Sequence, residues 1–446
     1  MSTTETDSIQ LASSSVSREL VPRLTIVRHP DPTLVGVGAP IGNDAMLGRD
    51  TAFLAGALDH GRVSREHARL RRKPNGTLVI EDRGSRNGTI VDGELIEGET
   101  ELADGAVIGV GPVMLLFHRA PRYVATRPHP IVWSVSHAMA QVIEQVRRAA
   151  REEGNVVLIG ETGVGKEVVA QALHDESGRT GELLAVNCAA VSDGVLQSEL
   201  FGHERGAFSG ADTTKVGLIE AAEHGTLFLD EIASASPALQ AALLRVLQDG
   251  KVRRVGATAT KAVDVRFVAA LLDGEQAGAG ALREDLWFRL ARRTIAIPPL
   301  RERREDIPYL AQRFAAHAAE QPVRLGRRLA WQLLAHDWPG NVRELRGVIE
   351  ALVTDHPPRE VDGFLELEVE APLFPPPRRR PSSGALKEGG VTKPARRPSR
   401  SELEALLREH EGQIASVARA VGVPRKTVYR WLKALNIEPD GFRDEP

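Results

Sequence analysis

The chain has 446 residues, which is too long for one hydrophobic core and predicts about three domains. Its 57 basic and 60 acidic residues give a net charge of −3, which excludes a wholly basic nucleic-acid coat but allows a local basic module. The single cysteine, Cys188, excludes an internal disulfide and a cysteine-cluster metal site. No apolar run is long enough to cross a bilayer, so we expect a cytoplasmic protein without membrane contact.

The first part of the chain has the pattern of a β-sandwich. Residues 1–19 are rich in Ser, Thr, Asp and Glu and are predicted to form a disordered tail. Between residues 20 and 119, short β-type runs at 24–27, 77–80 and 113–117 are separated by turn pairs such as Asn75-Gly76. This spacing predicts an all-β sandwich.

Three short motifs stand on the predicted loops of this sandwich. They are Gly48-Arg49, the run from Ser64 to His67, and the run from Ser85 to Thr89. Together they resemble the forkhead-associated (FHA) domain, a reader of phosphothreonine peptides. The resemblance implies that phosphate and peptide backbone are bound by Arg49, Ser64, Arg65 and Asn87, while His67 braces the loops. A guanidinium, a hydroxyl and amide donors suit a dianionic phosphate. The alternative is a sandwich that only packs against its neighbours.

A phosphate-binding loop follows the apolar run at 156–159 and precedes a helical pattern from 168. Glycines let backbone N–H groups surround phosphate oxygens, and the lysine adds a point charge. The next residue is an acid rather than Ser or Thr, so the metal must be held from elsewhere. The candidate nucleotide-binding residues are Gly160, Glu161, Thr162, Gly163, Val164, Gly165, Lys166 and Glu167.

A second chemical signature is the apolar run 227–229, which ends in Asp230 and Glu231. Strands and helices alternate from residue 130 to 370, which predicts an α/β layer with a mostly parallel sheet. Ligands bind at the carboxyl edge of such a sheet, where the two acids would lie. Asp230 is predicted to coordinate Mg²⁺, and Glu231 to orient and polarise the attacking water.

Between these signatures lies a glycine-flanked loop with an apolar tip, and with it the chain resembles a known family. The loop is similar to the GAFTGA signature of sigma-54-dependent activators, which are AAA+ ATPases. The stretches 225–232, 283–290, 298–303 and 338–345 match the same family in order. The resemblance implies that the loop contacts sigma-54 through Gly206, Ala207, Phe208, Ser209, Gly210 and Ala211.

The same resemblance implies an ATP-hydrolysing ring, commonly a hexamer that is a dimer at rest, with ATP and Mg²⁺ at subunit interfaces and a lid from about residue 300. Arg283 and Arg289 would be the arginine fingers, Arg343 the second sensor and Asn187 the switch that restrains Glu231. Arginines neutralise the charge on the transferred phosphoryl group. An arginine supplied by a neighbour makes catalysis depend on assembly.

Two positions depart from the family pattern. Ser209 stands where the family has Thr, so the hydroxyl is kept and a methyl is lost. The strand at 265–270 is followed by Leu271-Leu272, where the family has Thr-Asn as its first sensor. Leucine cannot hydrogen-bond to phosphate or water. We therefore predict altered hydrolysis or coupling, with nucleotide binding kept.

The end of the chain has the pattern of a DNA-binding module on a tether. Residues 371–398 are rich in Pro, Arg and Gly and predict a linker. Residues 399–446 predict two helices joined at Gly422, the second of them basic, which is typical of a helix-turn-helix. The module resembles the Fis-type domain of sigma-54 activators. The candidate DNA contacts are Arg425, Lys426, Thr427 and Arg430.

The sequence thus predicts three parts: an FHA sandwich, an α/β AAA+ ATPase with a helical lid, and an all-α helix-turn-helix. The function implied is ATP-driven opening of promoters by sigma-54 RNA polymerase, from upstream promoter DNA, under control of a phosphothreonine protein or a Ser/Thr kinase. One alternative is a DNA-binding regulator whose AAA+ domain binds ATP without hydrolysing it, which Leu271-Leu272 favours. A second alternative is a phosphopeptide-docking scaffold.

Overall fold

The computed structural model describes residues 20–121, 129–273 and 282–374, and the single positions Arg400, Leu403, Leu407 and Leu432. The chain divides into two compact units, Met1–Arg378 and Arg379–Pro446. All the elements from β1 to β22 belong to the first unit. The predicted helix-turn-helix and its four candidate DNA contacts lie outside the described residues.

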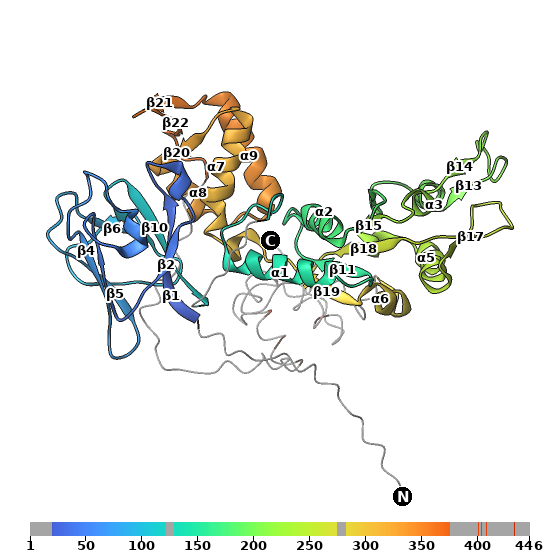
Figure 1. The fold of residues 1–446 in the computed structure, drawn as a ribbon, viewed down its shortest axis with the longest axis horizontal. Helices are drawn as coiled ribbons and strands as arrows, with labels where there is room; N and C mark the ends of the chain where they lie inside the picture. The colour runs from blue at the N-terminus through green and yellow to red at the C-terminus, as the bar shows by residue number, and fades with distance from the viewer. Residues whose placement is uncertain are drawn as a thin grey trace, which may run out of the picture. The chain divides into compact units, whose positions relative to one another are not determined.

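The predicted β-sandwich is confirmed and comprises two antiparallel sheets (Figure 1). Its interior holds large apolar side chains from both sheets, including Leu24, Leu47 and Ile80. One sheet has the order β2-β1-β10-β9-β6-β7, and the other β3-β4-β5-β8. The bounds are β1 Leu20–Arg28, β2 Gly38–Pro40, β3 Asp44–Leu47, β4 Ala68–Arg72, β5 Leu78–Asp82, β6 Thr89–Val91, β7 Glu94–Leu95, β8 Thr100–Glu101, β9 Val107–Val110 and β10 Val113–Pro121.

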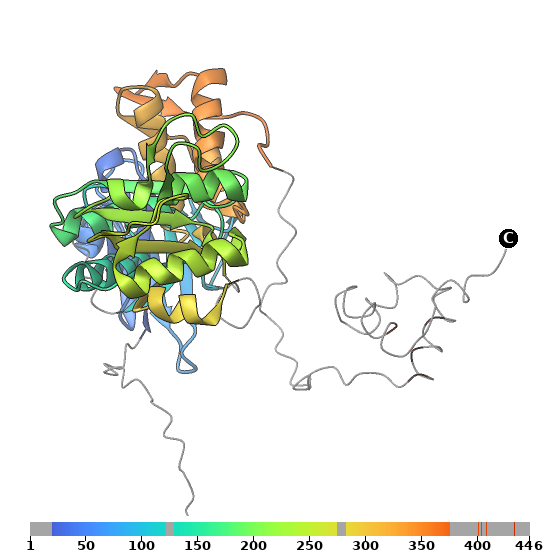
Figure 2. The ribbon, with the colours of Figure 1, turned by 90° about the vertical axis from the view of Figure 1, so that its right-hand side faces the viewer.

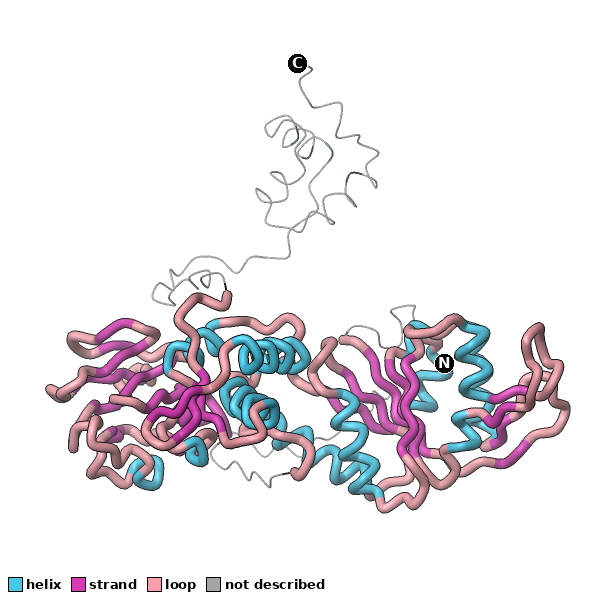
Figure 3. Tube along the Cα trace, turned by 90° about the horizontal axis from the view of Figure 1, so that it is seen from above, coloured by secondary structure: helices cyan, strands magenta, loops and turns pink. Residues whose placement is uncertain are grey.

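The central part is a five-stranded parallel sheet of order β12-β15-β18-β11-β19, covered by helices on both faces (Figures 2 and 3). Alternate residues of β11 face opposite helix layers. Val156 and Leu158 pack with α1 and α2, while Val157 and Ile159 lie in the core formed with α5 and α6. The bounds are α1 His137–Ala150, β11 Val156–Ile159, α2 Lys166–Ser177, β12 Leu183–Asn187, β15 Thr226–Asp230, α5 Pro237–Asp249, β18 Arg266–Leu271, α6 Glu284–Leu290 and β19 Arg293–Ala296.

Two small hairpins extend from this layer. The first joins β13 to β14 through the predicted sigma-54 loop, and the second joins β16 to β17. They occupy the same end of the domain as α3 in Figure 1. The bounds are α3 Asp193–Phe201, β13 Gly202–His203, β14 Lys215–Val216, α4 Leu218–Ala221, β16 Lys251–Val252 and β17 Lys261–Ala262.

The predicted lid is a helical subdomain with a three-stranded sheet of order β20-β22-β21. Its core is centred on the fully buried Trp338, whose indole N–H donates to the carbonyl of Leu333 at 2.8 Å. The bounds are α7 Asp306–Ala318, β20 Val323–Leu325, α8 Arg327–Ala335, α9 Asn341–Asp355, β21 Arg359–Val361 and β22 Phe364–Leu367.

The sandwich and the lid share one hydrophobic core. Val27, Val107, Met114 and Leu116 point away from the sandwich interior and belong to the same buried cluster as the lid helices. Along β10 the alternation is complete, because Val113, Leu115 and Phe117 fill the sandwich instead. Strands β1, β9 and β10 of the six-stranded sheet are therefore largely buried on both faces.

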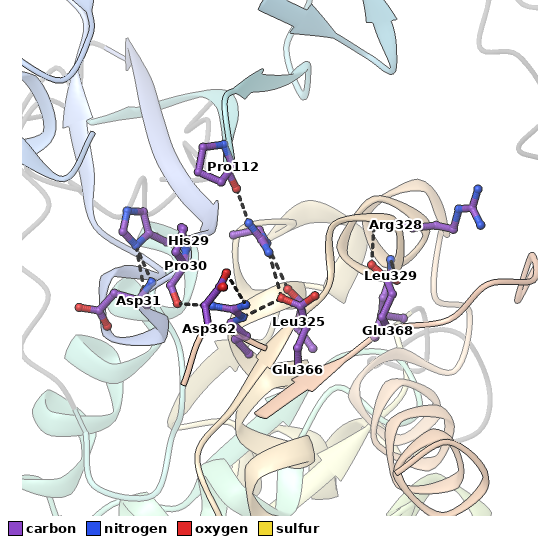
Figure 4. A network of polar contacts seen from close by, with 12 residues as sticks. His29, Pro30, Asp31, Pro112, Leu325, Arg328, Leu329, Asp362, Glu366 and Glu368 are labelled. Atoms are coloured by element: carbon purple, nitrogen blue, oxygen red, sulfur yellow. Dashed lines mark hydrogen bonds and ion pairs between the residues drawn. The ribbon is translucent and has the colours of Figure 1, made fainter. Parts of the chain in front are cut away.

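Polar contacts surround this shared core (Figure 4). The Arg28 guanidinium donates to Glu366 and to the carbonyl of Leu325, both at 3.2 Å. Arg324 donates to the same Glu366 carboxylate at 2.7 Å and to the carbonyl of Pro30 at 3.4 Å. One lid carboxylate thus lies between an arginine of the sandwich and an arginine of the lid.

Candidate functional site

The phosphate loop lies between β11 and α2, as its spacing predicts. Gly163 and Gly165 have φ values of 76° and 106°, a backbone region that favours glycine. Lys166 begins α2, and its Nζ donates to the carbonyls of Gly160 at 2.8 Å and Glu161 at 3.2 Å. These contacts hold the lysine over the loop in which a phosphate would bind.

The start of lid helix α9 is bonded directly to this loop. The Asn341 amide donates to the carbonyl of Thr162 at 3.0 Å and to Glu161 Oε2 at 3.1 Å. The backbone N–H of Val342 donates to Gly163 O at 3.0 Å. A Cβ on Gly163 would lie 2.3 Å from the carbonyl of Gly340, so glycine is required for this approach. The lid and the phosphate loop are therefore held together by direct hydrogen bonds.

Arg343 is brought to the same place by this contact. Its backbone N–H donates to Gly163 O at 3.3 Å, while its side chain is exposed. The predicted second sensor thus stands beside the loop. Sequence reasoning gave no role to Asn341 or Arg301. Arg301 pairs with Glu161 at 2.6 Å, and that bond, with the one from Asn341, lowers the pKa of Glu161 to about 2.

The two predicted catalytic acids lie at the carboxyl end of β15, two strands from β11 in a parallel sheet. Asp230 pairs in register with Asn187 of β12. Glu231 has φ 52° and ψ 42°, a left-handed conformation that is strained for a residue with a side chain. Such strain is typical of functional sites.

The contact of Asn187 differs from the one that its predicted role requires. We expected it to restrain Glu231, but its Nδ2 donates to Asp230 Oδ2 at 3.3 Å, and its Oδ1 accepts from Ala189 N–H at 2.8 Å. The register of β12 with β15 explains the difference, because it places Asn187 opposite Asp230, one residue before Glu231. In this structure the amide orients the predicted metal ligand.

The donors present suit Mg²⁺ bound together with a nucleotide. Within residues 20–121, 129–273 and 282–374, no three His, Cys, Asp or Glu side chains gather into a metal site. Mg²⁺ characteristically takes one or two carboxylates and completes its shell with phosphate oxygens and water. Asp230 fits the carboxylate role.

Strand β18 ends at Leu271 and is followed by Leu272, the pair predicted to replace the first sensor. The side chain of Leu271 is fully buried in the core beneath α5 and α6, and its carbonyl accepts from Gly160 N–H at 3.3 Å. Leu272 is half-buried at the strand end. Leu271 thus bonds to the phosphate loop through its backbone alone.

The two predicted arginine fingers are exposed at α6. Arg283 is paired with Asp285 at 2.8 Å, whereas the guanidinium of Arg289 makes no hydrogen bond or ion pair with another described residue. Phe288 beside it is 68% exposed, although it is a large apolar side chain. An exposed aromatic between two arginines is typical of a protein interface.

The predicted sigma-54 loop is a closed turn with an accessible tip. Gly206 N–H donates to Ala211 O at 2.8 Å, and Gly206 and Gly210 have φ values of 82° and 98°. Phe208 is 46% exposed, and its ring meets that of His203 edge-on at 5.0 Å. Ser209 is exposed beside it. The loop is therefore available to a partner.

The FHA motif residues are gathered at one end of the sandwich. Arg49 N–H donates to the carbonyl of Ser64 at 3.1 Å, and Arg86 N–H donates to the Ser64 hydroxyl at 3.1 Å. The Asn87 amide donates to the carbonyl of Arg62 at 2.7 Å. The carbonyl of Arg65 lies 1.9 Å from the position that a Cβ on Gly48 would occupy, so there is no room for a side chain at position 48.

The fully buried His67 connects these loops. Ser64 N–H donates to its Nδ1 at 3.2 Å, so Nδ1 is the acceptor, and the proton on Nε2 is donated to Gly88 O at 3.1 Å. Burial lowers the pKa of His67, which favours this neutral form. His67 thus fixes the distance between the loops that carry Ser64 and Asn87.

Three family models match parts of this chain. The sigma-54 interaction domain family matches residues 132–296, an AAA+ ATPase lid domain matches 301–363, and the FHA domain matches 46–111. The chain is 42% identical over 308 residues to the C4-dicarboxylate transport transcriptional regulatory protein DctD of Rhizobium meliloti, covering 67% of this chain and 63% of that protein. It is 40% identical over 309 residues to the Nif-specific regulatory protein of Klebsiella pneumoniae, covering 66% and 57%.

Among solved structures, NtrX from Brucella abortus in complex with ADP is 33% identical, with a TM-score of 0.50, covering 69% of this chain and 70% of NtrX. The chain belongs to the sigma-54 activator family. It spans less than two thirds of the length of the two curated relatives named above. The AAA+ domains of this family have ATPase-type activity, and the sandwich matches the FHA domain. No helix within the described residues has the length and apolar character needed to span a membrane.

Proposed function

We propose that this protein opens promoters held by sigma-54 RNA polymerase, using ATP hydrolysis that a phosphothreonine partner regulates. The observation that carries the proposal is the joining of lid and phosphate loop by Asn341, in a domain that also presents Phe208 to solvent. A change of lid position on hydrolysis would be transmitted through the phosphate loop to the α/β domain that carries the sigma-54 loop. The protein would act in the cytoplasm.

The reaction would be attack of water on the γ-phosphorus of ATP, giving ADP and phosphate. Lys166 would exchange its bonds with the two loop carbonyls for bonds with phosphate oxygens. Glu231 would accept a hydrogen bond from the attacking water and then take a proton from it. Asp230 would hold Mg²⁺, which neutralises charge on the phosphate oxygens. Arg343 would contact the nucleotide from its own subunit.

Assembly would complete the site. Arg289, exposed beside Phe288, would reach the γ-phosphate in a neighbouring subunit of a ring, with six subunits when active and two at rest. Residues 399–446 would bind upstream promoter DNA through Arg425, Lys426, Thr427 and Arg430. The sandwich would bind a phosphothreonine protein or Ser/Thr kinase through Arg49, Ser64, Arg65 and Asn87.

The test is open-complex formation by sigma-54 RNA polymerase on promoter DNA, with ATP, with and without a phosphothreonine peptide. The full chain should open the promoter only with ATP, and Glu231→Gln should bind ATP without releasing phosphate. Phe208→Ala should release phosphate but leave the promoter closed, whereas Val195→Ala, an exposed apolar truncation elsewhere, should behave as wild type. Normal opening by Phe208→Ala would remove the proposed role of the loop.

A second candidate function is favoured by Leu271-Leu272. In it the chain binds DNA and ATP but does not turn ATP over. Equal, background-level phosphate release by wild type and Glu231→Gln would establish this alternative. The third possibility, a phosphopeptide-docking scaffold, predicts that peptide binding has no effect on promoter opening.

A further inference from the structure

A cleft of about 570 Å³ lies where the sandwich meets the lid. Its walls come from both: Arg28, Arg62 and Asn87 from the sandwich, and Arg324, Arg327 and Glu366 from the lid. These lid residues are at β20, β22 and the start of α8. The cleft therefore exists only because the two subdomains share a core.

The charge in this cleft is unbalanced. Four arginines face two carboxylates, Asp362 and Glu366. Glu366 is already paired with Arg28 at 3.2 Å and Arg324 at 2.7 Å, and Asp362 lies 3.8 Å from Arg324. Burial lowers the pKa of Arg28; the charges of Glu366 and Glu368 oppose this, and those of Arg324 and Arg327 add to it. The cleft is thus a positive environment even after its ion pairs are counted.

Two guanidinium groups, one from each wall, have no partner among the described residues. Those of Arg62 and Arg327 make no hydrogen bond or ion pair with any residue that the structure describes. Arg327 reaches across to the sandwich, because its Nη2 lies 2.8 Å from the place of a Cβ on Gly109. The α8 N–H groups beside it are already capped, since Glu368 accepts from Arg328 and Leu329. The unpartnered donors are therefore the guanidinium groups themselves.

The cleft is continuous with the FHA motif residues. Asn87 lines it and bonds to the carbonyl of Arg62 at 2.7 Å, and the neighbouring Arg86 N–H bonds to the Ser64 hydroxyl. A peptide whose phosphate lies against Arg49 and Ser64 would pass Asn87 and enter the cleft. An anionic side chain there would meet two arginines, and charge-assisted bonds of this kind are among the strongest polar contacts.

We propose that the AAA+ lid forms part of the phosphopeptide site, with Arg62 of the sandwich and Arg327 of the lid together binding an anionic group that flanks the phosphothreonine. This inference rests on the proposed reading of phosphothreonine by the sandwich. The anionic group is an acidic side chain or a second phosphorylated residue, because both present oxygens to a guanidinium fork.

The experiment measures binding of the full chain to three fluorescent phosphothreonine peptide pools that differ only in the flanking residues. These are Asp and Glu, Asn and Gln, or Asn and Gln with one added phosphothreonine. Arg327→Glu should weaken binding of the preferred anionic pool about tenfold and leave the Asn/Gln pool within about twofold. The pool that loses more affinity identifies the source of the anion. Arg328→Glu is the matched control, because Arg328 instead donates to the carbonyl of Glu370.

Arg49→Ala distinguishes two hypotheses: that the sandwich reads phosphothreonine, and that Arg62 and Arg327 together form a composite site for the flanking anion. If it abolishes binding of every pool while Arg327→Glu affects no pool or all pools equally, the composite site is wrong and phosphothreonine reading stands. If no pool binds the wild-type chain, or if Arg49→Ala binds as wild type, phosphothreonine reading at this site fails, and the composite site fails with it. A fourth pool, with Lys flanks, tests the direct contact, and stronger binding of this pool by Arg327→Glu than by wild type would support it.

Discussion

The side-chain amide of Asn341 donates to the backbone carbonyl of Thr162 at 3.0 Å, across 179 residues of chain. The same side chain accepts from Leu300 N–H at 2.8 Å and is fully buried. One residue at the start of a lid helix therefore positions the nucleotide loop, the lid and the segment that joins them.

We expect Asn341→Ala to weaken ATP binding about tenfold and to lower the thermal stability. The substitution leaves the N–H of Leu300 and the carbonyl of Thr162 without partners, and an unsatisfied buried group costs about 1–3 kcal/mol. Titration with a fluorescent nucleotide and calorimetry measure the two effects. Asn75→Ala, which removes an acceptor from an exposed turn, is the control. Unchanged nucleotide affinity in Asn341→Ala would contradict the role given to the lid contact.

Leu272→Asn should raise the rate of phosphate release. The substitution places an amide at the end of the strand that leads to the site, and one positioned polar group can contribute roughly tenfold or more to turnover. Because Leu272 is half-buried, the polar group can be solvated. Leu271→Asn should instead destabilise the protein by about 3 kcal/mol, since that side chain is fully buried. A Leu272→Asn variant no faster than wild type would show that the leucines do not limit hydrolysis.

Arg289→Ala should reduce ATP turnover about 10³-fold, because the arginine acts on a neighbouring subunit's phosphate. Arg245→Ala, an exposed arginine on α5, should retain activity. Mixing Arg289→Ala with Glu231→Gln, each inactive alone, should recover part of the phosphate release. In a mixed ring, some interfaces combine an intact Glu231 with an intact Arg289. No recovery at any ratio would place Arg289 outside the catalytic interface.

Much of the nucleotide site could be predicted from the sequence, because its motifs are local. The loop at 160–167 and the acids after β15 carry their chemistry in consecutive residues. Asn341 and Arg301 were missed because their partners lie 140 or more residues away, and nothing in their own segments indicates which loop they contact. The contact of Asn187 also differed from expectation, because strand register decides which acid it meets.

The sandwich, too, could be predicted only in part from the sequence. Its strands and turns were predictable, but its docking on the lid was not. The run Val113–Phe117 has no polar residue, and that pattern is typical of a strand buried on both faces. It could have indicated that the outer face is covered. It could not have indicated that Met114 and Leu116 meet the lid, since any apolar surface would satisfy the same pattern.

A pH effect should arise from Glu305, which lies in the lid directly before α7. Burial, together with the charge of Asp306, raises the pKa of Glu305 to about 7. Between its ordinary pKa of 4.5 and about 7, the folded chain binds more protons than the unfolded chain, so this group's contribution to stability falls as pH rises. Well above pH 7 the stability that protonated Glu305 contributes is fully lost.

We therefore expect Glu305→Gln to be more stable than wild type at pH 8, by on the order of 2 kcal/mol, and equal to it near pH 4.5. Urea denaturation at the two pH values measures the difference. Glu302→Gln, an exposed neighbour, should change neither value. A Glu305→Gln variant less stable than wild type at pH 8 would mean that the carboxylate is ionised and favourably paired.

The burial of Met114 and Leu116 among the lid helices has a consequence for motion. A domain suspended on a tether tumbles independently of the machine that carries it. Here the sandwich shares a buried core with the lid, the subdomain proposed to respond to nucleotide. Any movement of the lid during hydrolysis would therefore move the sandwich with it. A partner bound to the sandwich would resist that movement and slow each cycle of hydrolysis.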